Sequence, residues 1–146
     1  MFGVLTGDVV QESTEAAWKV VHSDLKELSM PVFIAPGNHD FVNPELYGEM
    51  VGKPYFDFEF EGDLFIVLNP FEENWNIKGK QLSFLKSVLE QKAGESRNVF
   101  VFFHQVLWWG KDSKYLKVVP NSFMGRSKHP NFWSEVVPLF KKLQNK

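Results

Sequence analysis

Three short apolar runs, each followed at once by a polar loop, constrain the fold of this chain more than any other sequence feature. They are residues 2–5, 32–35 and 99–103. Their length and composition are typical of buried strands. Apolar residues at helical spacing over 14–29 separate the first two runs. Strand, helix and strand therefore form a βαβ unit, for which we expect parallel strands and a right-handed crossover. The sequence predicts an α/β fold.

The middle of the chain departs from this alternation. Residues 55–60 alternate between polar and Phe side chains, residues 61–63 carry a turn signal, and residues 64–68 are apolar. This pattern is typical of a β-hairpin. Because a hairpin is antiparallel, its presence in an α/β pattern predicts a mixed sheet or a second sheet.

Two further helices and a long loop complete the pattern. Apolar residues follow helical spacing over 80–91 and again over 132–143. In the second segment Pro138 is compatible only with a helix that starts late or is kinked. Residues 105–130 show no period, and we expect one long loop there.

Aromatic residues make up 16% of the chain, and this much ring surface must be buried in a core or presented to a ligand. We expect the Phe-rich strand to lie in the core. For the rings of the long loop, which include Trp108 and Trp109, two interpretations stay open. They pad the loop against the sheet, or they line a substrate pocket.

Composition excludes several classes of protein. The chain has 146 residues, of which 44% are hydrophobic and 23% charged, as in ordinary globular proteins. Sixteen basic and 18 acidic residues give a net charge of −2, which leaves no electrostatic signature for nucleic acid. The absence of cysteine excludes a disulfide scaffold and a thiol nucleophile. No apolar run is long enough for a membrane span or a signal peptide, so the sequence assigns no compartment.

Each of the three apolar runs is followed by residues that can bind a metal ion. Asp8 follows the first, Asn38 and His39 follow the second, and His104 follows the third. Because ligands bind beyond the carboxyl ends of strands in open α/β sheets, we expect these side chains to converge. Oxygen and nitrogen donors without sulfur favour Zn, Mn, Fe or Co over Ca.

Taken singly, these residues have ordinary structural explanations. Gly-Asp at residues 7–8 is a common turn dipeptide, and a lone histidine after a strand is more often a buried structural residue. Asp40 can cap the turn beyond it. The run Gly37-Asn38-His39-Asp40 is the specific signal, because four particular residues must coincide after a strand.

A resemblance to a known family rests on three segments: Gly7-Asp8-Val9-Val10, Gly37-Asn38-His39-Asp40 and Phe103-His104-Gln105-Val106-Leu107-Trp108. Their order and strand–loop settings resemble the second, third and fourth signature blocks of the calcineurin-like metallophosphoesterases. Residues 81–85 resemble the helix after the central hairpin of that family. The resemblance covers most of the chain and implies a partial α/β/β/α sandwich with mixed sheets.

The resemblance also implies a role for each matching residue. Asp8 corresponds to the aspartate that bridges two metal ions. Asn38 corresponds to a ligand of the second metal that also holds a phosphate oxygen, and His104 to a histidine ligand of that metal. His39 corresponds to a general acid or electrostatic stabiliser beside the leaving group. Asp40 corresponds to the acidic residue that closes the block, for which we expect a role in orienting His39.

The implied function is hydrolysis of a phosphoester by two divalent cations, typically ~3.5–4 Å apart. The sequence leaves open whether the bond is a phosphomonoester, a phosphodiester or a pyrophosphate. Besides Asn38, the candidate substrate contacts are Trp108, Trp109 and Arg126. A surface role is the favoured alternative for Arg126.

Two family blocks have no counterpart here. Only seven residues precede Asp8, too few for the upstream Asp-x-His block, and no Gly-His-x-His follows His104. We therefore expect residues 1–146 to form one truncated domain that binds at most one ion, weakly, through Asp8, Asn38 and His104. Such a domain would have little activity alone and would associate through exposed sheet edges. The alternatives are a non-catalytic scaffold that binds proteins, or an artificial reading frame with an internal Met1.

Overall fold

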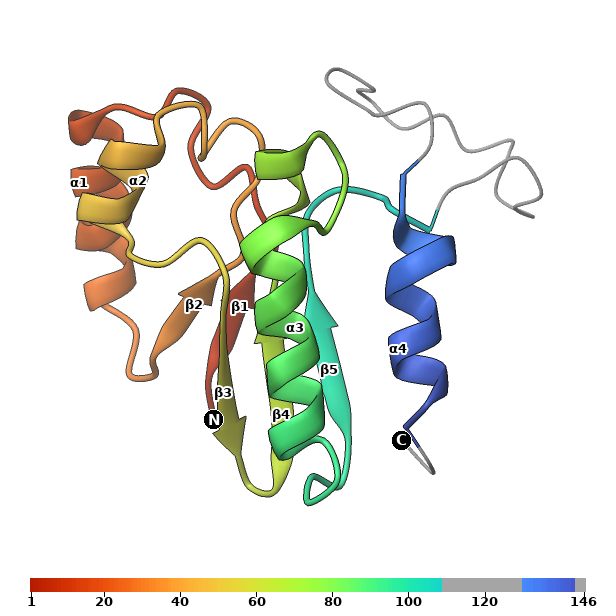
Figure 1. Cartoon of the computed structure of the whole chain (residues 1–146). Helices are drawn as coiled ribbons and strands as arrows, with labels where there is room; N and C mark the ends of the chain where they lie inside the picture. The colour runs from red at the N-terminus through yellow and green to blue at the C-terminus, as the bar shows by residue number, and fades with distance from the viewer. Residues whose placement is uncertain (109–129, 144–146) are drawn as a thin grey trace, which may run out of the picture.

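Two sheets form the centre of the structure, and each contains a parallel pair of strands (Figure 1). The computed structural model describes residues 1–108 and 130–143. In the first sheet, β1 (Gly3–Leu5) pairs in parallel with β2 (Val32–Ile34), and α1 (Glu15–Lys26) connects them. The predicted βαβ unit is therefore confirmed. Thr14 begins α1, because its side chain accepts a hydrogen bond from the Ala17 amide at 3.2 Å.

The second sheet has the strand order β3-β4-β5. β3 (Phe56–Phe60) runs antiparallel to β4 (Asp63–Val67), and β4 runs parallel to β5 (Val99–Phe102). Glu61 and Gly62, with φ of 51° and 81°, make the two-residue turn that suits a hairpin. The helix α3 (Gly79–Lys92) connects β4 to β5. The hairpin pattern predicts a mixed sheet or a second sheet. The structure has both, because the second sheet contains one antiparallel and one parallel pair of strands.

Shorter elements fill the remaining described segments. A short helix, α2 (Pro44–Met50), has no counterpart in the sequence analysis, although Asn43 caps it and proline occupies its first turn. A 3₁₀ turn, η1 (Pro70–Glu73), follows β4. At the end of the chain a π turn, η2 (Phe132–Val136), leads into α4 (Val137–Lys141). Pro138 thus lies in the first turn of a helix that starts late, as predicted. Most of the predicted long loop lies outside the described residues.

A layer of phenylalanine rings joins the two sheets. The Phe33 ring stacks on Phe58 with 4.1 Å between centroids, and Phe2 meets the Phe65 ring edge-on at 4.9 Å. The Phe65 ring also stacks on Phe58 and on Phe100, each at 5.0 Å. The Phe-rich strand is therefore core, as the aromatic content indicates.

Helices cover the outer faces of both sheets (Figure 1). Leu64 and Ile66 of β4 are fully buried against Leu85 of α3, in the larger apolar cluster. On the first sheet, Trp18 of α1 and Tyr47 of α2 are fully buried in a second cluster. The layers are helix, sheet, sheet and helix, which is the predicted sandwich. No helix in residues 1–108 and 130–143 is both long and apolar enough to cross a membrane.

The ring layer yields a stability prediction. Phe65 is 9% exposed and contacts rings from both sheets, so Phe65→Ala should lower the free energy of unfolding by about 3–5 kcal/mol. Phe100 is 43% exposed and stacks on the same ring, so Phe100→Ala should cost about 1 kcal/mol. Urea denaturation of both variants measures the difference. A loss in Phe65→Ala no larger than about 1 kcal/mol would show that the ring layer does not hold the sheets together.

Candidate metal centre

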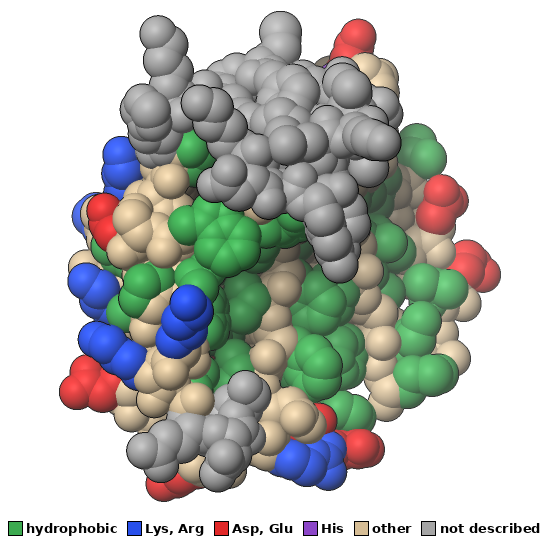
Figure 2. Space-filling model, turned by 90° about the vertical axis from the view of Figure 1, so that its right-hand side faces the viewer, with side chains coloured by type: hydrophobic (Ala, Val, Ile, Leu, Met, Phe, Trp, Pro, Cys, Tyr) green, Lys and Arg blue, Asp and Glu red, His purple; other side chains and the backbone are tan. Residues whose placement is uncertain are grey.

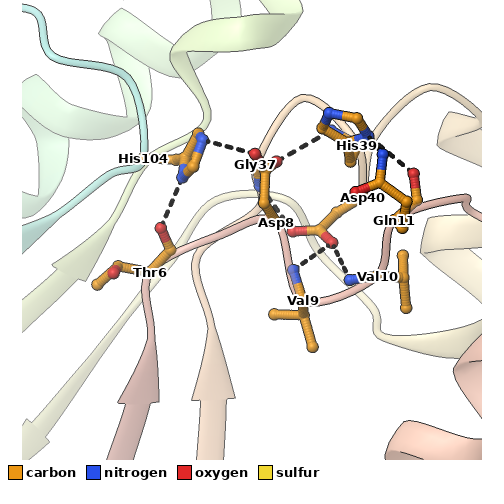
Figure 3. A network of polar contacts seen from close by, with 9 residues as sticks. All are labelled: Thr6, Asp8, Val9, Val10, Gln11, Gly37, His39, Asp40 and His104. Carbon is orange, nitrogen blue, oxygen red and sulfur yellow. Dashed lines mark hydrogen bonds and ion pairs between the residues drawn. The ribbon is translucent and has the colours of Figure 1, made fainter. Parts of the chain in front are cut away.

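Loops from three strands meet at one edge of the two sheets (Figure 3). Asp8 follows β1, the turn at residues 37–40 follows β2, and His104 follows β5. The contact between the His104 ring and the Thr6 carbonyl joins positions 98 residues apart in the chain. The structure therefore brings Asp8, His39 and His104 together, although no local sequence feature connects them.

The His104 ring lies between a carbonyl and a carboxylate. Its Nδ1 lies 2.8 Å from the Thr6 carbonyl oxygen, which can only accept, so Nδ1 carries the proton. Its Nε2 lies 3.2 Å from Oδ2 of Asp8. In a neutral ring this leaves a lone pair directed at a carboxylate oxygen, an arrangement that a cation would stabilise. A metal-bound histidine typically donates its other ring N–H to such a carbonyl.

The donor set fits one divalent cation. Two ligand atoms that bind one ion at about 2.1 Å each lie about 3 Å apart, close to the separation found between Asp8 and His104. Their side chains are 36% and 26% exposed, so the pair is open to solvent. Residues 1–108 and 130–143 contain no group of three acidic or histidine side chains that could hold an ion. A third donor would have to be a neutral one, such as the Asn38 amide.

The backbone at Asp8 has an uncommon conformation. Gly7 and Asp8 have φ of 92° and 52°, in the left-handed region that glycine adopts most easily. A Cβ added at Gly7 would lie 2.5 Å from Nδ1 of His104, and one at Gly37 would overlap the Asp8 carboxylate. Both glycines are thus required because the His104 ring and the Asp8 carboxylate approach their backbone. The close approach of these side chains distinguishes Gly7 and Gly37 from ordinary turn glycines, and the sequence alone does not show it.

The turn at residues 37–40 places His39 beside Asp8. The His39 amide donates to Oδ1 of Asp8 at 3.1 Å. The His39 Nδ1 donates to the Gln11 carbonyl at 2.7 Å (Figure 3). Asn38 is half-buried in the same turn. Gln11 has no place in the sequence analysis, because a backbone carbonyl that fixes a ring carries no sequence signal.

Asp40 is fully buried, and all of its carboxylate bonds run to backbone amides. Its Oδ1 accepts from Val9 at 2.8 Å and from Val10 at 3.0 Å, and its Oδ2 accepts from Gly37 at 2.8 Å. Burial, and to a smaller extent the charge of Asp40, raise the pKa of the Tyr47 phenol, which therefore stays a hydrogen-bond donor.

These contacts correct the expected relation between Asp40 and His39. The Gln11 carbonyl, not the Asp40 carboxylate, holds the His39 ring. The physical reason is burial: a carboxylate removed from water needs several donors, and the nearby backbone amides supply three. Asp40 connects the two loops and makes no direct contact with the imidazole.

The predicted substrate contacts are only partly described. Trp108 is 37% exposed, and its carbonyl accepts a hydrogen bond from the Trp133 indole at 3.2 Å. This bond connects the end of the β5 loop to the C-terminal helical segment. Trp109 and Arg126 lie outside the described residues.

Comparison with known proteins gives concordant results. The calcineurin-like phosphoesterase family model matches residues 2–143. Over 109 residues the chain is 28% identical to a probable cyclic nucleotide phosphodiesterase of Fibrobacter succinogenes. The matched segment covers 69% of this chain and 40% of that protein. Over 111 residues it is 29% identical to a probable cyclic nucleotide phosphodiesterase of Coxiella burnetii, with 68% and 42% covered. The chain thus spans about two-fifths of the length of these relatives. The family match spans nearly the whole chain, so this protein belongs to the calcineurin-like phosphoesterases.

Proposed function

We propose that this chain carries part of the active site of a metal-dependent phosphoester hydrolase of the dinuclear type. The observation that supports the proposal best is the His104 ring, whose Nδ1 is held by the Thr6 carbonyl and whose Nε2 faces Asp8. Membership of a family of phosphoester hydrolases is consistent with this geometry. The relatives named as probable cyclic nucleotide phosphodiesterases make phosphodiesters the first substrates to test.

Three residues would hold the cation: Asp8 through a carboxylate oxygen, His104 through Nε2, and Asn38 through its neutral amide oxygen. This donor set suits Mn, Zn, Fe or Co. A bound cation of this kind would polarise the phosphoester and acidify a water molecule. With one acidic and one histidine donor in contact, we expect at most one ion, held weakly.

The proposed role of His39 is to move or hold a proton beside the leaving group. Its Nδ1–H is engaged by the Gln11 carbonyl, so Nε2 is the atom that can serve a substrate oxygen. The His39 amide, bonded to Asp8, keeps this ring next to the proposed metal ligand. Asp40 would act through the loops and not on the reacting atoms.

A non-catalytic scaffold is the alternative. A scaffold has no need to retain the candidate site residues, yet the chain keeps them all: Asp8, Asn38, His39 and His104. We therefore favour the enzyme. The coverage of 40–42% of the relatives fits a partial catalytic domain, and low activity of this chain alone stays a prediction.

The edge of the second sheet supports a proposal of self-association. In the described part of the chain, β5 pairs only with β4, and the segment Val99–Phe102 carries no charge. Figure 2 shows apolar side chains gathered on this side of the molecule. A groove of about 320 Å³ runs there, lined by Val101 and Phe103 near β5 and by Phe140 of α4 among others. An uncharged edge that has no second strand partner among residues 1–108 and 130–143 favours pairing with a second copy.

Metal binding tests the proposed centre. Asp8→Asn and His104→Gln should each weaken Mn²⁺ binding by about tenfold or more, because each removes a direct ligand. His22→Gln, a histidine substitution in α1, serves as the matched control and should change nothing. Isothermal titration calorimetry measures all four proteins. A wild-type chain that binds no divalent cation would favour the scaffold.

Turnover tests the expected impairment. With Mn²⁺ and bis(p-nitrophenyl) phosphate, the purified 146-residue chain should hydrolyse substrate at a rate near the uncatalysed background. Release of p-nitrophenol measures this, with Asp8→Asn as the blank. Substantial metal-dependent turnover that Asp8→Asn abolishes would contradict the impairment while supporting the reaction class.

Sedimentation velocity tests the open edge. The wild-type chain should sediment as a concentration-dependent dimer, and Phe100→Lys, at a ring 43% exposed on β5, should shift it toward monomer. Val20→Lys, at a position 61% exposed on α1, should leave the dimer intact. A sharp wild-type monomer at high concentration would rule the proposal out.

A further inference from the structure

Asp40 joins the two loops that carry the proposed metal ligand and the proposed proton donor. We infer that Asp40 is a positioning residue: its buried carboxylate holds Asp8 and the His39 ring in place through backbone amides, without touching either reacting group. The inference rests on the proposed function, because it concerns the same centre. It assigns to Asp40 a role different from that of orienting an imidazole directly.

The two carboxylate oxygens divide their bonds between the loops. Oδ1 accepts from Val9 and Val10 in the loop after β1, at 2.8 and 3.0 Å. Oδ2 accepts from Gly37, in the turn after β2, at 2.8 Å. A single side chain therefore connects backbone segments that are about 30 residues apart, with separations of 31, 30 and 3 residues from Asp40. Moving one loop relative to the other would break at least one of these bonds.

Two of the amides that bond to Asp40, those of Val9 and Val10, lie between Asp8 and the residue that anchors the His39 ring. Val9 and Val10 follow Asp8 directly and precede Gln11, whose carbonyl receives the His39 Nδ1 proton (Figure 3). Fixing residues 9 and 10 thus fixes the left-handed conformation at Asp8 on one side and the anchor of the His39 ring on the other. One carboxylate sets both positions.

Burial gives this connection its strength. Asp40 is fully buried, and the ion pairs of residues 1–108 and 130–143 do not include it. Its charge is therefore stabilised by amide donors, which form stronger bonds to an ionised oxygen than to a neutral one. Because these donors belong to the loops themselves, the charge is satisfied only when both loops are in position.

A second, independent contact anchors the backbone of Asp40. The Ser13 hydroxyl donates to the Asp40 carbonyl at 2.9 Å, and the buried Trp18 indole donates to Ser13 at 3.1 Å. This contact stabilises the turn without involving the carboxylate. Ser13→Ala therefore provides a matched control, since it removes a bond to the same residue but leaves both loops connected.

Asp40→Asn separates the two effects because it preserves size. An amide has one oxygen acceptor and one NH₂ donor, so whichever way it is turned, an NH₂ faces a backbone N–H. Either the bond to Gly37 or the bonds to Val9 and Val10 must then be lost. Asp40→Glu keeps the charge but lengthens the side chain, so it tests whether charge alone suffices.

The experiment measures Mn²⁺ affinity by electron paramagnetic resonance, at a temperature where circular dichroism shows every variant folded. Asp40→Asn should weaken binding by about 10–100-fold, and Ser13→Ala should stay within about threefold of wild type. Asp40→Glu should not restore wild-type affinity. Wild-type affinity in Asp40→Asn would overturn the inference. Failure of the wild-type chain itself to bind Mn²⁺ would instead overturn the proposed function.

A second readout needs no metal. In ¹⁵N-labelled protein, Asp40→Asn should speed amide hydrogen exchange at Val9, Val10 and Gly37 and should shift the His39 ring nitrogens away from the Nδ1–H tautomer. Ser13→Ala should leave the His39 nitrogens unchanged. Unchanged exchange and tautomer in Asp40→Asn would show that the carboxylate does not set the loops, whatever the metal result.

Discussion

Packing of the two sheets through phenylalanine rings places the end of β5 beside the end of β1, and the candidate centre depends on this placement. The Phe65 ring contacts Phe2 from the first sheet and Phe100 from the second. At the far end of the same strands, His104 reaches the Thr6 carbonyl and the Asp8 carboxylate. The apolar layer thus sets the distance between donors that no local contact could bring together.

Within the centre, the hydrogen bonds of the buried Asp40 carboxylate hold the two loops together, as ring packing holds the two sheets together. Asp40 has no access to water, so it takes its hydrogen bonds from the two loops that bear Asp8 and His39. Glycine at positions 7 and 37 leaves the space that the His104 ring and the Asp8 carboxylate occupy. Backbone hydrogen bonds therefore hold the loops, while the side chains of Asp8, His39 and His104 stay available for the proposed cation and substrate.

Each side of the molecule has a buried cluster and a groove. The first sheet packs against α1 and α2, with Trp18 and Tyr47 fully buried, and a groove of about 330 Å³ lies beside β2. The side next to β5 carries an apolar groove and a strand edge that pairs only with β4 among the described residues.

The sequence by itself determined the strands, the helices α1 and α3, the C-terminal helical segment and the end of the sheet where the polar residues gather. Apolar runs and their spacing carry this information, because burial selects residue type at each position. It could not reveal α2, whose short length offers no period, or the partners of Asp40 and His39. Those partners are the amides of Val9, Val10 and Gly37 and the carbonyl of Gln11. Every residue but proline carries such backbone groups, so only the tertiary structure decided which of them a buried carboxylate and an imidazole would meet.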